Sequence, residues 1–274
     1  MAVDLMIELA KSRLAIVGAG GMARILVKIF RKSIPDISII SRSLEKARRF
    51  SRRLGIGYAS LDEIGGFDIV VLTPPSDVLP DVVKSISDRL KAGSLVMDVA
   101  SIKLGVVDRI SPILPESVEY LSIHPLFGPA TRRLEGNRVI LIPVRGESYL
   151  EPIRRVFEEA GLRVTYSSPE EHDRMMAFIQ VAHHLSYLSL ALTLWRNIGP
   201  DKTSDYLTRS LRKTFRMFRM FQANLKVIEE IARLNRFRHD AISSLKESLD
   251  ELARGEPDAW RLAEEALKIL SEKA

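Results

Sequence analysis

The fold of this chain is decided by the stretch Leu14-Ala15-Ile16-Val17-Gly18-Ala19-Gly20-Gly21-Met22-Ala23. Four apolar residues typical of a buried strand lead directly into a G-x-G-x-x-A pattern that opens a helical stretch. We expect Gly18 to permit a tight turn, Gly20 to let the backbone approach a pyrophosphate, and Ala23 to keep helix and strand close. Free backbone N–H groups at the helix start would then hold the phosphates. The expected cofactor-binding residues of this loop are Gly18, Gly20, Gly21, Met22 and Ala23.

The sequence around this loop divides into two halves of different kind. From about Arg13 to Tyr166, short β-branched runs alternate with amphipathic stretches, which is typical of a parallel sheet with crossover helices. From Ser168 onward the strand signals stop and only helical patterns follow. We therefore predict an α/β Rossmann-type dinucleotide-binding domain over residues 1–167 and an all-α domain over residues 168–274. The expected strands are Leu14–Val17, Ile37–Ile40, Ile69–Leu72, Leu95–Asp98 and Val139–Pro143.

A well-marked helix start opens the second half. Ser168 is typical of an N-cap, Pro169 fits the first helical position, and Glu171 would complete a capping box. The helix that follows, to about Trp195, is apolar nearly all round from residue 178 to residue 194. Such a pattern indicates burial on most faces, and in a small domain it predicts packing against another subunit. We therefore expect an all-α dimerisation domain and a homodimer.

Composition limits the functions that the chain can have. It has 274 residues, of which 46% are hydrophobic and 28% charged, as in globular proteins. The absence of cysteine excludes a disulfide framework, a thiolate nucleophile and a Cys-ligated metal, and we expect no metal site. The net charge of +6 raises the possibility of nucleic-acid binding. Because basic residues are interleaved with acidic ones and no zinc or aromatic RNA-binding motif is present, small anionic ligands are the better interpretation.

No part of the sequence is expected to enter a membrane. The run Leu185–Leu194 is shorter than a bilayer span and contains hydroxyl-bearing side chains. The first ten residues include Asp4 and Glu8, whereas a signal peptide has a basic start and an uncharged core. The sequence therefore predicts a soluble cytoplasmic protein.

The end of the second expected strand bears on the choice of cofactor. NAD enzymes usually place an Asp or Glu there to bind the ribose hydroxyls, whereas this chain has Ser41, Arg42 and Ser43. A guanidinium and two hydroxyls suit a 2′-phosphate, so the sequence favours NADP while leaving NAD open. The alternative is that Arg42 is an ordinary exposed loop residue. Thr73 and Pro74, after the third strand, are expected to line the cofactor cleft.

Three further motifs carry a resemblance to a known family. They are Asp98-Val99-Ala100-Ser101-Ile102-Lys103, His124-Pro125-Leu126-Phe127-Gly128-Pro129, and Glu171-His172-Asp173-Arg174 with Gln180 and His184 further along the same helix. Together with the glycine loop, in this order, they resemble the prephenate and arogenate dehydrogenase family of tyrosine biosynthesis. The resemblance extends from about Leu14 to the helices after Asn235.

The resemblance implies the two-domain fold, a helical domain that dimerises, and an NAD(P)-dependent oxidative decarboxylation. Hydride leaves the hydroxyl-bearing ring carbon of prephenate, and the ring carboxylate is lost as CO₂. The product is 4-hydroxyphenylpyruvate. Arogenate, which carries an amino acid in place of the keto acid, would give tyrosine directly.

The resemblance also assigns roles to individual residues. His124 matches the catalytic histidine, and an imidazole near its ordinary pKa suits a base for the hydroxyl proton. Ser101 matches a serine beside the nicotinamide that would orient the hydroxyl; its alternative role is a helix N-cap. His184 matches a histidine near the substrate. His172 and Asp173 belong to the family motif, and we expect a structural role for them.

Arginines on one predicted helix are candidates for substrate binding. Arg209, Arg212, Arg216 and Arg219 recur at steps of three and four residues and so share one helix face, with Leu211, Phe215, Phe218 and Gln222 on another. The resemblance implies that Arg219 binds a substrate carboxylate, and Arg216 is the alternative one turn away. For the first two arginines we favour a solvated basic stripe.

Two other functions stay open. A different reductase of the same plan, acting on imines or β-hydroxyacids, would not need both the motif that begins at His124 and the one that begins at Glu171. A non-catalytic NADP-sensing regulator would keep the glycine loop but would not need His124, Ser101 and a basic helix together.

Overall fold

The computed structural model describes residues 8–272. They form two compact units, of which the first ends at His172 and the second begins at Asp173. This division lies within helix α6 (Pro169–Met176). We call the two parts the sheet unit and the helical unit.

The sheet unit is built on an eight-stranded sheet with the order β3-β2-β1-β4-β5-β6-β7-β8. The strands from β3 to β6 in this order are parallel, β7 is antiparallel to β6, and β8 is parallel to β7. The predicted Rossmann-type class is confirmed. The strands are β1 (Arg13–Val17), β2 (Asp36–Ile40), β3 (Gly57–Ala59), β4 (Ile69–Leu72), β5 (Leu95–Asp98), β6 (Glu119–Pro125), β7 (Arg138–Arg145) and β8 (Arg163–Tyr166).

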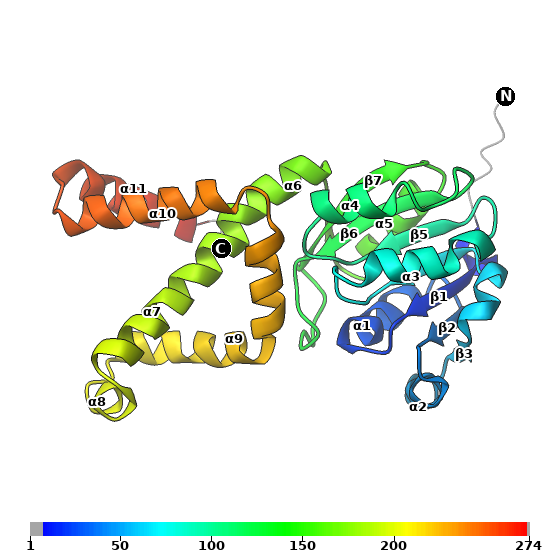
Figure 1. The fold of residues 1–274 in the computed structure, drawn as a ribbon, viewed down its shortest axis with the longest axis horizontal. Coiled ribbons are helices and arrows are strands. Elements are labelled where there is room, and N and C mark those ends of the chain that lie inside the picture. The colour runs from blue at the N-terminus through cyan, green and yellow to red at the C-terminus, as the bar shows by residue number, and fades with distance from the viewer. Residues whose placement is uncertain (1–7, 273–274) are drawn as a thin grey trace. The chain divides into compact units, whose positions relative to one another are not determined.

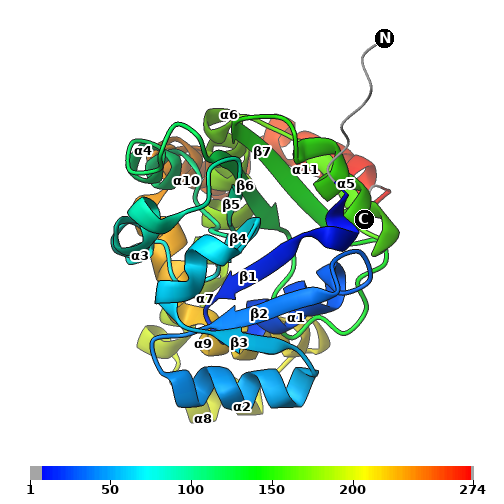
Figure 2. The same ribbon diagram turned by 90° about the vertical axis from the view of Figure 1, so that its right-hand side faces the viewer.

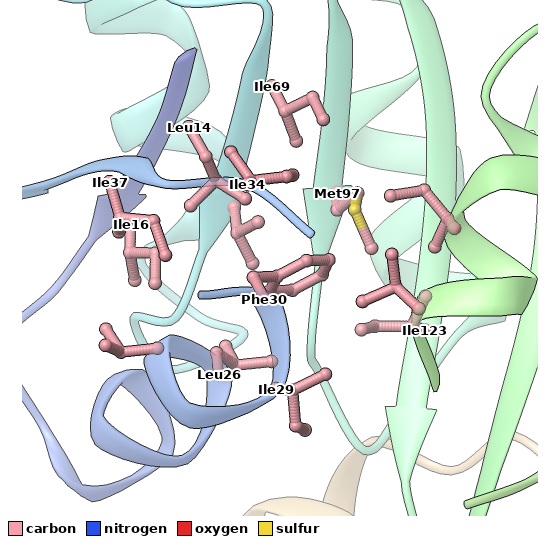
Figure 3. Packing of buried hydrophobic residues seen from close by; sticks show 14 of the residues in the cluster. Leu14, Ile16, Leu26, Ile29, Phe30, Ile34, Ile37, Ile69, Met97 and Ile123 are labelled. Carbon is pink, nitrogen blue, oxygen red and sulfur yellow. The ribbon is translucent and has the colours of Figure 1, made fainter. Parts of the chain in front are cut away.

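Helices cover both faces of this sheet, as Figure 2 shows. On one face α1 (Gly21–Phe30) and α5 (Leu150–Glu159) bury a cluster that includes Leu26 and Phe30 (Figure 3). In it the rings of Phe30 and Phe157 meet edge to face, with 5.7 Å between their centroids. On the other face α3 (Leu79–Ile86) and α4 (Leu104–Ile110) bury a second cluster. The strands between them are therefore apolar on both sides, as parallel strands require. The remaining helical segments of this unit are η1 (Leu9–Lys11), α2 (Leu44–Leu54), η2 (Leu61–Gly66) and η3 (Ser87–Arg89).

Three strands, β3, β6 and β8, are absent from the sequence prediction. β3 has three residues and includes the exposed Tyr58, and every residue of β8 except Val164 is exposed. Neither has the apolar run by which a buried strand is recognised. β6 is buried but contains Ser122 and His124, which interrupt its hydrophobic pattern.

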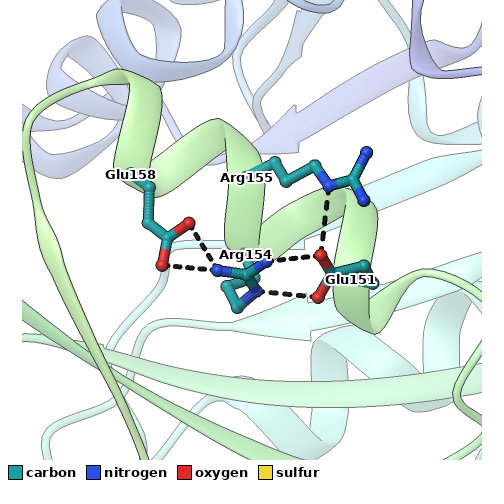
Figure 4. Close-up of polar contacts among 4 residues, drawn as sticks. All are labelled: Glu151, Arg154, Arg155 and Glu158. Carbon is teal, nitrogen blue, oxygen red and sulfur yellow. Dashed lines mark hydrogen bonds and ion pairs between the residues drawn. The ribbon is translucent and has the colours of Figure 1, made fainter.

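Charged side chains on α5 pair with one another (Figure 4). The guanidinium of Arg154 bonds the carboxylates of Glu151 and Glu158, and Arg155 Nε lies 3.0 Å from Glu151 Oε1. Hydrogen bonds from Arg154 and then Arg155 lower the pKa of Glu151 to about 2. The predicted interleaving of opposite charges is confirmed on this helix. Such exposed ion pairs are screened by solvent and add little stability. They do neutralise the positive charge of Arg154 and Arg155 locally.

The helical unit starts with a capped helix. Ser168 Oγ accepts a hydrogen bond from Glu171 N at 3.1 Å, which confirms the predicted N-cap. The predicted capping box is wrong, because the Glu171 carboxylate accepts from Ser167 Oγ at 2.9 Å instead. Beyond α6 the chain continues as the π-helical segment η4 (Ala177–Ala182) and α7 (His183–Asn197).

A bent helix forms the middle of the helical unit. After α8 (Pro200–Asp205), α9 (Arg209–Leu234) bends where Asn224 leaves the helical conformation, as Figure 1 shows. The buried Asn235, directly after α9, donates from Nδ2 to the carbonyl of Asp173 at 2.8 Å and accepts from Phe237 N. This side chain joins the end of α9 to α6. The unit ends with α10 (Arg238–Ala253) and α11 (Pro257–Ser271).

Within one chain α7 is not covered, so the burial predicted for this apolar helix would need a second subunit, as expected from the sequence. No residue of α7 is buried, and Trp195 is 68% exposed. The helical run Pro169–Asn197 also has the length and hydropathy to cross a bilayer, whereas the sequence prediction considered only residues 185–194. A single helix of this kind also occurs in proteins outside membranes.

Candidate active site

The glycine turn after β1 has the predicted geometry. Gly18 has φ +111°, and a Cβ added there would overlap Thr73 Oγ1. Thr73 in turn donates from Oγ1 to the carbonyl of Val17 at 2.9 Å. Gly20 is the N-cap of α1, and open space surrounds the position of its absent Cβ. The turn is therefore closed on the side of β4 and open where a pyrophosphate would approach the helix start.

The segment after β2 lies beside this turn, since Gly18 N donates to the carbonyl of Ile40 at 2.8 Å. Ser43 caps α2 by accepting from Lys46 N at 3.2 Å, so one of the two hydroxyls has a structural role. Arg42 is exposed, and no acidic residue stands between Ile40 and Ser43. The segment therefore presents an exposed cation and no carboxylate between Ile40 and Ser43, the position at which dinucleotide-binding folds contact the ribose.

The motif that begins at His124 also reaches the glycine turn. Arg24 Nη2 donates to the carbonyl of Pro129 at 3.3 Å, and a Cβ on Gly21 would overlap the Pro129 side chain. The loop after β6 therefore packs on the first turn of α1. Arg24 and Pro129, which are 105 positions apart in sequence, thus meet beside the carboxyl ends of the parallel strands.

His124 is held by a second histidine. Its Nδ1 lies 2.8 Å from Nε2 of His172, and the two rings are buried, with 3% and 1% of their surface exposed. An imidazole that takes a proton at Nε2 must already carry hydrogen on Nδ1 and donate it. His172 can accept that bond and thereby set the tautomer of His124. The predicted structural role of His172 thus includes the orientation of the candidate base.

A buried ion pair lies next to β6. Lys103 is fully buried; its Nζ lies 3.0 Å from Asp98 Oδ1 and 2.6 Å from the carbonyl of Ile123. Tyr120 donates its hydroxyl to Asp98 Oδ2 at 2.8 Å, and Ala100 N donates to Oδ1 at 2.9 Å. In the sequence, Lys103 is the last residue of the motif that begins at Asp98, and no role was predicted for it. Nothing in the motif indicated that the lysine side chain is buried.

The pKa of His124 differs from the expectation. Burial lowers this pKa well below its ordinary value, and the neighbouring His172 and Lys103 lower it further. The expected pKa near 6.5 is therefore wrong, because the site disfavours the imidazolium. At neutral pH the ring is unprotonated and can accept a proton.

Ser101 is available for ligand binding. It is half-buried, and its hydroxyl makes no hydrogen bond within residues 8–272. Helix α4 starts at Leu104 with Lys103 as its N-cap residue. The alternative assignment of Ser101 as a helix N-cap is therefore wrong.

In the helical unit, the π-helical segment and the first turn of α7 each hold a buried polar atom without a partner among the described residues. Gln180 Oε1 and His184 Nδ1 are buried and lack a hydrogen bond among the described residues. Burial, followed by the neighbouring His183, lowers the pKa of His184 to about 4, and Phe221 packs edge-on against its ring at 5.1 Å. Buried polar atoms without partners are unusual, and π-helical segments are frequent at functional sites. Sequence analysis did not assign Gln180 a role.

A cavity of about 740 Å³ lies between α7 and α9. Arg212 and Arg219 line it, whereas Arg209 and Arg216 do not. The predicted separation of arginines and aromatic residues onto different faces is therefore wrong for Arg212 and Arg219, which line the cavity together with Phe215 and Phe218. Arg209 and Arg212 are exposed, as expected for a solvated stripe. The lining residues are Leu188, Ala191, Leu207, Arg212, Phe215, Phe218, Arg219, Phe221, Gln222 and Leu225.

Comparison with known proteins gives relatives that include prephenate and arogenate dehydrogenases. A protein of Methanocaldococcus jannaschii described as "Probable arogenate/prephenate dehydrogenase" is 28% identical over 182 residues, which are 65% of this chain and 41% of that protein. A Schizosaccharomyces pombe protein described as "Probable prephenate dehydrogenase [NADP(+)]" is 24% identical over 192 residues, 68% of this chain and 44% of its own length. The chain thus spans less than half the length of these curated relatives.

The fold has close counterparts among solved structures. The crystal structure of prephenate dehydrogenase from A. aeolicus, in complex with hydroxyphenyl propionate and NAD⁺, superposes with a TM-score of 0.83 at 23% identity. The superposition covers 97% of this chain and 99% of the other.

Two family matches follow one another along the sequence. Residues 26–166 match the nucleotide-binding domain of prephenate dehydrogenase, and residues 168–260 match its dimerization domain. The first match takes in β2 to β8 and the loop after β6, and the second takes in the helices from α6 to α10. Since these matches cover most of the chain in the order that the fold has, the protein belongs to the prephenate dehydrogenase family.

Proposed function

We propose that the protein catalyses the NADP-dependent oxidative decarboxylation of prephenate to 4-hydroxyphenylpyruvate. One observation carries the proposal: His124 is buried, neutral, and bonded through Nδ1 to His172, which leaves Nε2 for a substrate proton. Its loop packs on the first turn of α1, the helix that the glycine turn opens. A base beside a dinucleotide turn suits the removal of a proton and a hydride from the same alcohol.

The residues of the sheet unit would share the chemistry as follows. The bound nicotinamide supplies the acceptor for the hydride. His124 Nε2 takes the proton of the ring hydroxyl, and the hydroxyl of Ser101 aligns it. The bond between ring and carboxylate then breaks, CO₂ leaves, and the electron pair of that bond completes the aromatic ring. His172 keeps the hydrogen of His124 on Nδ1 throughout.

The helical unit would bind the anionic groups of the substrate. Arg219 supplies the guanidinium for the side-chain carboxylate, and the unpartnered Gln180 and His184 supply polar atoms for hydrogen bonding. Among the described residues, those that line the cavity with Arg219 include no carboxylate that could pair with an ammonium group. This favours the keto acid prephenate, and arogenate is the alternative that the family admits.

A second copy of the chain would complete the molecule. The match to a dimerization domain and the exposed apolar residues of α7 support a homodimer. A partner subunit that covers α7 would also explain why this helix is apolar, so no membrane is needed to explain it. This agrees with the predicted cytoplasmic location.

A steady-state assay that crosses prephenate and arogenate with NADP and NAD tests the substrate and the cofactor together. We expect the highest kcat/KM for prephenate with NADP. Arg42→Ala should lower the preference for NADP over NAD by about tenfold or more, chiefly through KM for NADP, because one charge-assisted phosphate contact is lost. Arg48→Ala, on the exposed side of α2, is the matched control.

A wild-type preference for NAD would contradict the cofactor assignment, and a preference for arogenate would contradict the substrate assignment. Nucleotide binding without turnover of either substrate would instead favour an NADP-sensing regulator.

His124→Asn should lower kcat by about 10²- to 10⁴-fold while cofactor affinity stays unchanged, because the amide keeps a polar shape but is not a base. In the wild type kcat/KM should rise with pH as His124 loses its proton. Since the folded site lowers that pKa, the rise should lie below pH 6.5 and the profile should be flat at neutral pH. Stopped-flow or steady-state rates across pH measure both effects, with the exposed His239→Asn as control. If the acidic limb of the pH profile is unchanged in His124→Asn, another group is the base, and His184 is the next candidate.

Arg219→Ala should raise KM for the substrate by about 10- to 100-fold, because a charge-assisted hydrogen bond contributes about 1.5–3 kcal/mol. KM for the cofactor should stay the same. Arg216→Ala is the matched control, because Arg216 lies one turn away and does not line the cavity. A large effect of Arg216→Ala with none of Arg219→Ala would show that the substrate-binding arginine is misassigned by one turn.

Sedimentation velocity should give a dimer at micromolar concentration. Trp195→Glu should weaken it, because the substitution places a charge on the exposed apolar surface of α7. Leu44→Glu, at an equally exposed apolar position on α2, should leave the sedimentation coefficient unchanged. A stable wild-type monomer would contradict the homodimer.

A further inference from the structure

We propose that Lys103 is a positioning residue: its buried ammonium binds the carbonyl of Ile123 and so fixes the backbone of β6 from which the His124 side chain projects. The role rests on the proposed function of His124 as the base. Lys103 itself takes no part in the proton or hydride transfer.

The position of Lys103 is the first support. Its Nζ lies 2.6 Å from the carbonyl of Ile123, the residue directly before His124 in β6. This bond is made by a side chain from the segment before α4, so it acts in addition to the backbone pairing of the strand. A shift of β6 at this residue would break it. The ammonium therefore fixes the backbone from which the His124 side chain projects.

The environment of Lys103 is the second support. Its charge is balanced by Asp98, which accepts two further hydrogen bonds from Tyr120 and Ala100. Burying such a pair costs desolvation energy, and replacing a buried pair by apolar residues is often neutral or stabilising. Stability alone therefore does not explain a lysine here. A fixed charge beside a candidate base provides a reason.

The charged groups around His124 come from different elements. His172 contacts it from α6, and Lys103 acts on it from the segment between β5 and α4. On β7 the residue opposite His124 is the apolar Ile140. A neighbouring ammonium disfavours the imidazolium, and His172 acts in the same direction. Removal of the Lys103 charge should therefore raise the pKa of His124.

The test uses Lys103→Met and the double variant Asp98→Asn/Lys103→Met in the full-length protein. The double variant removes both charges, so no carboxylate is left buried without its cation. NMR titration of the His124 ring protons should show a higher pKa than in the wild type, and the acidic limb of kcat/KM should move to higher pH in the same direction. We expect kcat to fall by about 10- to 100-fold, with KM for NADP unchanged. Lys91→Met, which breaks an exposed ion pair with Asp68, is the matched control and should alter neither.

A folded double variant whose His124 titration and kcat match those of the wild type would overturn the proposal. Loss of folding in both variants would overturn it as well, because the ammonium would then serve the fold and not the imidazole. A raised His124 pKa in a protein that turns over neither prephenate nor arogenate would refute the proposed function but leave the effect of Lys103 on His124 intact.

Discussion

The hydrogen bond between His124 and His172 is the contact on which the candidate site depends. It connects the last residues of β6 to the first turn of α6, and both rings are buried. In such a contact between two imidazoles, one ring nitrogen donates and the other accepts. When His172 accepts, His124 carries its hydrogen on Nδ1, which is the tautomer that the proposed function requires.

The sheet unit shows how burial changes the chemistry of ordinary side chains. Asp98, Lys103 and Tyr120 lie in the interior, and each has a partner there. Burial raises the pKa of the Tyr120 hydroxyl well above its usual value, and the Asp98 carboxylate raises it further. The tyrosine therefore stays a hydrogen-bond donor at any pH at which the protein works.

The sequence was sufficient for the parts of the fold that depend on local pattern. The glycine turn, β4, β5 and the Ser168 cap follow from short runs whose chemistry is local. β6 was missed because its buried residues include polar ones, whose partners come from distant segments. For the same reason the contacts of His124 with His172 and of Ile123 with Lys103 could not be predicted: they join residues 48 and 20 positions apart. Phe178 and Trp195 are exposed in the single chain, and their apolar pattern alone does not say which surface covers them.

The glycine turn has a consequence for the way in which this sequence can vary. Gly18 is constrained twice, by a positive φ and by the overlap of any Cβ with Thr73. A smaller residue at position 73 would remove the overlap but not the backbone strain, which costs an L-residue about 1–2 kcal/mol. Gly21 is constrained only by its contact with Pro129 and has no positive φ. Among homologues, position 18 should therefore be invariant, whereas positions 21 and 129 are free to change if they change together.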